Sequence, residues 1–186
     1  MSFLTLSKMF VSSKEGWPEL EVIHPAVSKL FTFLVLPLSM LPPIMLYFAG
    51  TRYGDEFLSG FSAKPWELIA TLFFVAEMLT FILMGWLIKA IAKANGADID
   101  THDAYMLAGI APIPLWLSAL GLFVPSLLFN AVVSIAALGL SCSIIYHGIY
   151  ALCHMHEEVV AASITQIVIG AGLIAWALLL VMIFPL

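Results

Sequence analysis

The sequence predicts an all-α membrane protein: five transmembrane helices in one bundle, preceded by a short amphipathic N-terminal helix. Two observations support this. Of its 186 residues, 62% are hydrophobic and 10% charged, whereas soluble domains carry about a quarter charged residues. The stretch 104–153 also contains no Asp, Glu, Lys or Arg. One helix of that length would reach about 75 Å. Because the hydrocarbon core of a bilayer is about 30 Å thick, the stretch must cross it twice.

Residues 1–29 are expected to form a cytoplasmic or interfacial segment. Apolar residues recur at helical spacing from Leu6 to Trp17, beside Lys8 and Lys14. Two interpretations are open. The helix lies in the headgroup plane with Trp17 as an interfacial anchor, or it packs on the inner mouth of the bundle.

Five spans with few charges follow. The first contains Pro37, Pro42 and Pro43, so we expect a kinked helix whose freed carbonyls are satisfied by neighbouring groups. Pro125 cannot continue a helix, which places the turn between the third and fourth spans at 124–126. A charged loop is expected at 51–65. The expected spans are residues 30–50, 66–88, 104–124, 128–153 and 160–186.

The basic residues indicate an orientation. With five spans, one side of the membrane holds Lys8, Lys14, Lys29, Lys89 and Lys93, and the other holds Arg52 and Lys64. Because Lys and Arg favour the cytoplasmic side, we expect a cytoplasmic N-terminus and an exported C-terminus. The net charge of -5 argues against nucleic acid as a partner, since phosphate binding needs clustered basic residues.

Glu77 is the main candidate for an intramembrane functional residue. It lies near the middle of the second span, where an ionised carboxylate costs about 2.5–3.5 kcal/mol. It should therefore face the bundle interior, at roughly the depth of Ser141 and Cys142 in the fourth span. One interpretation is a proton or cation relay. The other, which we favour because a relay usually needs several ionisable groups, is a neutral acid that donates one interhelical hydrogen bond.

His147 is a second intramembrane candidate, at the depth of Thr165 and Gln166. A pH-sensitive group and a neutral histidine that ties two helices together are both compatible with the sequence. The structural interpretation is favoured, because the sequence offers no carboxylate at that depth.

His102, His154 and His156 are weak candidates for metal ligands. They lie with Asp and Glu in two expected polar loops, and these side chains suit zinc or manganese. Neither loop has an established metal spacing, so we expect solvated acidic loops without a metal or cofactor. The sequence contains no nucleophile elbow, P-loop, dinucleotide fingerprint or HExxH motif. No catalytic residues are therefore assigned, and the protein is not expected to be an enzyme.

The order of features resembles the bacterial branch of the Yip family, small five-span membrane proteins related to the eukaryotic Ypt/Rab-interacting proteins. The third span is similar to the family's Ala-Gly-Tyr, Pro-Leu and Leu-Ser-Gly-Leu pattern, although Ile110 and Ala119 depart from it. The fourth span ends similarly to the family's Tyr-x-Gly. The matching positions are Gly109, Pro114, Leu117, Ser118, Tyr146 and Gly148.

This resemblance implies that residues 30–186 form one five-helix Yip-like domain, in a bacterial cytoplasmic (inner) membrane with the N-terminus inside. The eukaryotic association with Rab GTPases does not carry over, since bacteria lack that machinery.

Together these features favour a non-enzymatic membrane scaffold or accessory protein. We expect its helix faces to bind membrane lipid, another integral membrane protein or a second copy of the chain. The alternative is a small transporter or channel that uses Glu77 for proton or cation coupling. A third class, a metal-dependent membrane enzyme, would require the two polar loops to hold a metal.

Overall fold

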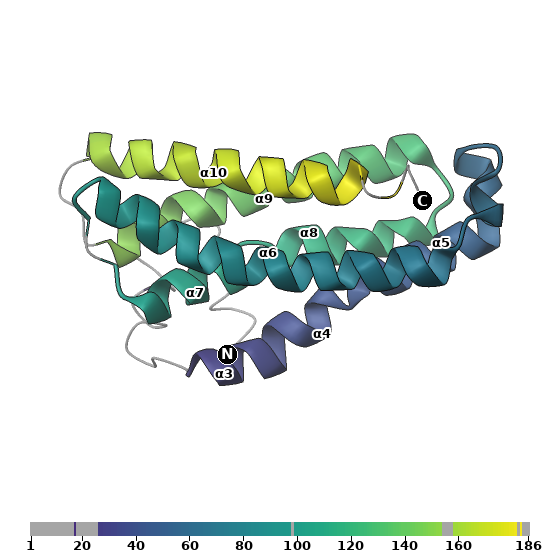
Figure 1. Ribbon diagram of the computed structural model, residues 1–186. Coiled ribbons are helices and arrows are strands. Elements are labelled where there is room, and N and C mark those ends of the chain that lie inside the picture. The colour runs from purple at the N-terminus through teal and green to yellow at the C-terminus, as the bar shows by residue number, and fades with distance from the viewer. Residues whose placement is uncertain (1–16, 18–25, 98, 154–157, 182, 184–186) are drawn as a thin grey trace.

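The computed structural model describes residues 17, 26–97, 99–153, 158–181 and 183, and these are helical with short connections. The prediction of five membrane-crossing helices is confirmed. Consecutive spans run in opposite directions along one elongated bundle (Figure 1). The helices long and apolar enough to span are Val27–Phe57, Trp66–Ala94, Thr101–Phe123, Leu127–Leu152 and Val160–Val181.

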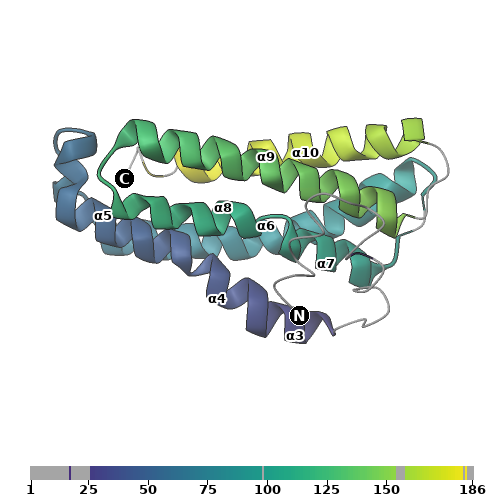
Figure 2. The same cartoon turned by 180° about the vertical axis from the view of Figure 1, so that it is seen from behind.

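The first span is broken into short pieces. α3 (Val27–Leu30) leads into the π-helical turn η1 (Phe31–Val35), then α4 (Leu36–Ser39) and α5 (Leu41–Phe57). The prolines lie at the first positions of α4 and α5, where a missing N–H costs no helical hydrogen bond. The expected kinks are therefore present. Both views show α3 and α4 inclined away from the other helices (Figures 1 and 2).

The N-terminal boundary differs from the prediction. Residues from Val27 onward already belong to the first span, and the proposed amphipathic helix falls on 1–16 and 18–25, outside the described residues. Trp17 is described, and its side chain is fully buried. Its ring lies where a side chain at Gly148 would be. The role of Trp17 as an interfacial anchor is therefore wrong, because its indole packs inside the bundle.

The predicted loop 51–65 is also shorter than expected. α5 continues to Phe57 past a kink at Tyr53 (φ -150°, ψ 32°), and Gly60 reverses the chain at a left-handed φ of 86°. A reciprocal pair of hydrogen bonds closes this turn: Asp55 N–H to Ser62 Oγ at 3.1 Å, and Ser62 N–H to Asp55 Oδ1 at 3.2 Å. These bonds hold residues 51–57 in helix although they carry charges.

A short connection joins the second span to the third, which begins with a side-chain cap. α6 (Trp66–Ala94) is uninterrupted, and α7 (Thr101–Ile110) begins after Asp100, whose side chain accepts from Thr101 N–H at 2.7 Å. Such a cap satisfies a backbone donor that the helix leaves unpaired. As a result His102 and Asp103 lie in the first helical turn, and their assignment to a loop is wrong.

The third span breaks at Ala111–Pro112, since Pro112 and Pro114 cannot donate to the preceding turn. It continues as α8 (Ile113–Ser118) and the 3-10 helix η3 (Ala119–Phe123). The turn predicted at 124–126 is confirmed. α9 (Leu127–Leu152) then starts on a Ser126 cap, and α10 (Glu158–Val181) completes the bundle.

Packing separates an interior from a lipid-facing surface. α7 is the most enclosed helix and packs against α6 and α9, with Met106, Leu107 and Ile110 fully buried. Large apolar side chains nevertheless cover the outside, such as Leu128 at 77% and Trp86 at 63% exposure. A soluble monomer does not present apolar surface on this scale, so lipid is the solvent that this surface requires.

The contact between α5 and α6 yields a testable prediction. A methyl group at Gly50 would lie 2.1 Å from ring atoms of Trp66, a buried side chain whose Nε1 donates to the Phe61 carbonyl at 2.7 Å. Gly50→Ala should therefore lower the free energy of unfolding in micelles by about 1–3 kcal/mol through overpacking. Gly170→Ala is the matched control, because no atom lies within 4 Å of the place that its added methyl group would take. Equal stability of the two variants would contradict this contact.

Candidate functional site

A cavity of about 620 Å³ lies among α5, α6, α8, α9 and α10. It reaches from the middle of the bundle toward the end where α5 turns into α6 and where the third span turns into the fourth. Its walls are mostly apolar and aromatic side chains, among them Phe73, Leu138 and Trp176. Small-molecule sites typically measure about 300–1,000 Å³, so this cavity is large enough for a ligand.

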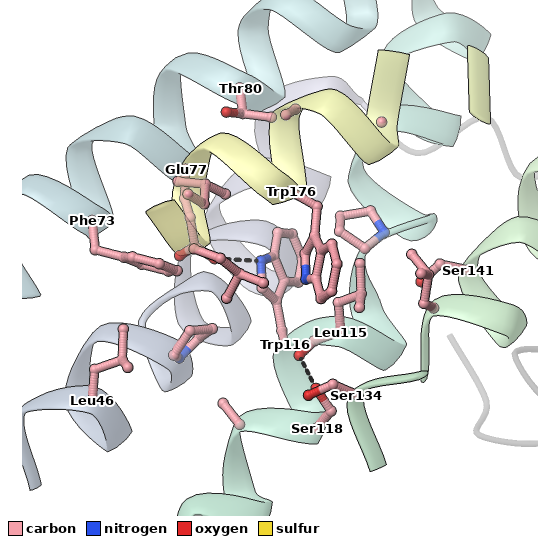
Figure 3. A pocket seen from close by; sticks show the side chains of 18 of the residues that line it. Leu46, Phe73, Glu77, Thr80, Leu115, Trp116, Ser118, Ser134, Ser141 and Trp176 are labelled. Atoms are coloured by element: carbon pink, nitrogen blue, oxygen red, sulfur yellow. Dashed lines mark hydrogen bonds between the residues drawn. The ribbon is translucent and has the colours of Figure 1, made fainter. Parts of the chain in front are cut away.

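Glu77 faces this cavity from α6. Its Oε1 accepts a hydrogen bond from Trp116 Nε1 of α8 at 3.1 Å (Figure 3). Both side chains are buried, with Glu77 at 7% and Trp116 at 5% exposure. The second oxygen of Glu77, Oε2, has no hydrogen-bond partner. Thus one carboxyl oxygen of Glu77 accepts a hydrogen bond from the protein, and the other has no partner.

Ser141 faces the same cavity from α9. It is 4% exposed, and its Oγ has no hydrogen-bond partner. This is unusual for a hydroxyl within a helix, which can bond back to a carbonyl three or four residues earlier. Two other hydroxyls on the cavity wall do so: Thr80 donates to Ala76 O at 2.8 Å, and Ser118 donates to Leu115 O at 2.7 Å.

Charge is nearly absent from the cavity. Among the described residues that line it, Glu77 is the only one with an ionisable acidic or basic side chain of the Asp, Glu, Lys, Arg or His type. Lys64 contacts two residues of the wall: its Nζ donates to the Ile183 carbonyl at 2.9 Å and lies 4.7 Å from the Phe61 ring centroid. Phe61 and Ile183 both line the cavity, so this lysine lies at one end of it.

His147 does not line the cavity. It lies half-buried on α9, in edge-to-face contact with the ring of Tyr146 at 5.3 Å. Thr165, expected at its depth, donates to the Ala161 carbonyl at 2.8 Å. A functional role for His147 stays a prediction.

Of the three metal candidates, the structure describes His102. His102 Nδ1 lies 3.0 Å from Asp103 Oδ1, whereas His154 and His156 fall outside the described residues. Within the described part of the chain, no three His, Cys, Asp or Glu side chains are grouped as metal ligands would be. Burial, and secondarily the charge of Asp103, raises the pKa of the Cys153 thiol to about 11, which keeps it protonated at neutral pH.

The six pattern positions serve different purposes. Gly109 and Gly148 permit close approach: a methyl group at Gly109 would lie 2.9 Å from Val35, and one at Gly148 would lie 2.5 Å from Leu107. Pro114 lies in the first turn of α8. Leu117 and Tyr146 are exposed, at 44% and 45%. Of the six, Ser118 lines the cavity.

Sequence reasoning did not identify Trp116 as the partner of Glu77. A usable signal was present, since a buried tryptophan N–H normally finds an acceptor and acceptors are scarce in uncharged spans. The cavity itself has no signature along the chain, because its walls come from segments between Pro42 and Ile183.

Among known families, the Yip1 domain matches residues 7–179 of the chain. No curated protein and no solved structure matches the chain.

The Glu77–Trp116 contact can be measured by a double-mutant cycle with Glu77→Leu and Trp116→Phe. We expect a coupling free energy of about 0.6 kcal/mol and at most about 1.7 kcal/mol, the average and the maximum found for side-chain hydrogen bonds between membrane helices. The measurement is reversible unfolding of the four proteins in mixed micelles. Strictly additive effects would show that the two groups do not interact.

Proposed function

This chain belongs to the Yip1 domain family, and on that premise we propose that it is a non-enzymatic integral membrane accessory protein that binds lipid in its interhelical cavity. The cavity is the observation that supports this proposal. It is about 620 Å³ in volume, mostly apolar, and set among helices that are long and apolar enough to cross a membrane. In such a position, acyl chains are the abundant molecules whose chemistry fits the walls.

We also propose a bacterial cytoplasmic membrane, with the N-terminus inside and the C-terminus outside. The distribution of charge supports this orientation. Lys89 and Lys93 lie near the C-terminal end of α6, and Arg52 and Lys64 lie at the opposite end of the bundle. Lys29 in α3 (Val27–Leu30) lies at the start of the first span, on the side of Lys89 and Lys93, and Lys8 and Lys14 precede that span in the sequence. Five basic residues against two favour that side as the cytoplasmic one.

A second copy of the chain or another integral membrane protein is the proposed partner on the outer face of α9. Gly139 is exposed there and has open space around it. Small residues at such positions allow helices from two proteins to approach closely in lipid.

The alternative function, a small transporter or channel, is supported by the unpartnered Oε2 of Glu77 inside the cavity. It is separated from lipid binding by Glu77→Gln, which keeps the shape of the side chain but cannot titrate. We expect proton flux across proteoliposomes to be the same for this variant, the wild type and protein-free vesicles. A flux that the wild type supports and Glu77→Gln abolishes would favour the transporter.

Filling the cavity tests lipid binding directly. Gly172 on α10 lines the cavity, and a methyl group added there would have Met84 Cε as its nearest neighbour, at 4.0 Å. Gly172→Phe should therefore enter the cavity and lower the amount of lipid retained through purification by at least about fivefold, a loss of about 1 kcal/mol in affinity.

Gly170→Phe is the matched control. It lies two positions away on α10, a methyl group added there would have no atom within 4 Å, and it does not line the cavity. Native mass spectrometry of both variants gives the bound lipid. Equal retention by the two phenylalanine variants, or no retained lipid on the wild type, would contradict the proposal.

A further inference from the structure

We propose that the cavity selects a neutral, oxygen-bearing lipid of the acylglycerol class, held by hydrogen bonds to Glu77 Oε2 and Ser141 Oγ. This inference rests on the proposed function, namely that the cavity holds lipid, and adds which lipid it prefers. Among the described residues, two buried side-chain polar atoms have no hydrogen-bond partner: Glu77 Oε2 and Ser141 Oγ. Both residues line this cavity, and this observation supports the inference.

The first step concerns the cost of leaving these atoms unpaired. Glu77 is 93% buried and Ser141 is 96% buried, from exposed fractions of 7% and 4%. A buried polar group without a hydrogen bond is costly, and more so where no water can reach it. Buried hydroxyls elsewhere in the bundle avoid this cost, as Thr165 does by bonding to Ala161 O at 2.8 Å. A ligand with polar groups of its own would form hydrogen bonds with Glu77 and Ser141 and so remove the cost of leaving them unpaired.

The second step concerns which groups these atoms accept. Glu77 Oε1 already accepts a hydrogen bond from Trp116 Nε1, as the carbonyl oxygen of a carboxylic acid does. In a neutral carboxylic acid the other oxygen, Oε2, carries the proton and donates. The Ser141 hydroxyl both donates and accepts. The ligand should therefore present an acceptor to Glu77 and either kind of group to Ser141, as glycerol hydroxyls and ester carbonyls do.

The third step concerns charge. The described lining residues include no Lys, Arg or His, so an anionic headgroup in the cavity interior would have no counter-ion and would face the one acid. A cationic amine would require an ion pair away from water, whose desolvation cost often exceeds the attraction gained. A neutral polar group avoids both costs.

The arrangement suits a ligand that spans the cavity. Glu77 and Ser141 extend from different helices on opposite sides of Trp116 and Trp176 (Figure 3). The two atoms therefore contact different parts of the ligand, and the apolar remainder of the walls accommodates the acyl chain.

The test compares four single-chain probes on the purified protein by native mass spectrometry: 1-monooleoylglycerol, 1-octadecene, oleylamine and oleate. We expect the wild type to retain monooleoylglycerol at least about tenfold more tightly than octadecene, since the hydrocarbon cannot make the two hydrogen bonds. Glu77→Leu and Ser141→Ala should each reduce this preference. Neither change should weaken octadecene binding.

Glu77→Gln makes the test specific. The Gln amide keeps one acceptor for Trp116 and one donor for the ligand, so the monooleoylglycerol preference should stay within about threefold of the wild type. Loss of the preference in Glu77→Gln, with oleylamine or oleate as the tightest probe, would overturn the proposal because charge would then govern binding. Thermal unfolding of each variant verifies that it is folded.

The wild-type probes alone also decide between the two proposals. Equal retention of monooleoylglycerol and octadecene would overturn the selection of a neutral polar lipid and leave lipid binding intact. Retention of none of the four probes would overturn lipid binding itself, and this inference with it.

Discussion

The structure depends on one constraint: the interior of a membrane offers no water, so polar groups must find partners within the protein or within a ligand. Within the described spans this requirement explains why several hydroxyls bond to carbonyls of their own helix, as Thr80 and Thr165 do. It also explains why the indole N–H of Trp116 is directed at Glu77. Glu77 Oε2 and Ser141 Oγ stand out against this background because the protein leaves them unsatisfied. Because both atoms belong to residues that line one cavity, that cavity can form hydrogen bonds with a ligand as well as apolar contacts.

Broken helices accompany this cavity. The breaks at Met40 and at Ala111–Pro112 divide the first and third spans, and after the second break Trp116 lies on α8, where its indole meets Glu77 of the unbroken α6. Glycines compensate for this irregularity elsewhere by allowing close packing, as Gly148 does beneath Leu107. The bundle is thus tightly packed around α7, whereas α5, α6, α8, α9 and α10 enclose a ligand-sized space.

The Yip1 domain match covers most of the chain, and the positions behind the resemblance mainly serve packing. Gly109 and Gly148 hold helices close together, and Pro114 begins α8. Glu77 matches no pattern position. Of the pattern positions, Ser118 lines the cavity, whereas the polar atoms that the protein leaves without a partner belong to Glu77 and Ser141.

The five spans, the proline breaks and the turn at 124–126 could all be predicted from the residues alone, because membrane crossing depends on local composition and proline acts on its own turn. The inward orientation of Glu77 could be predicted in the same way, since a carboxyl group in lipid is costly. Local capping and turn hydrogen bonds moved the ends of elements, so that His102 lies in a helix. Only the tertiary structure decided that Trp17 is buried, that Trp116 meets Glu77 and that a cavity unites Glu77 with Ser141. These are contacts between residues far apart in the chain, and their geometry follows from how the helices pack, which the periodicity of each helix alone does not specify.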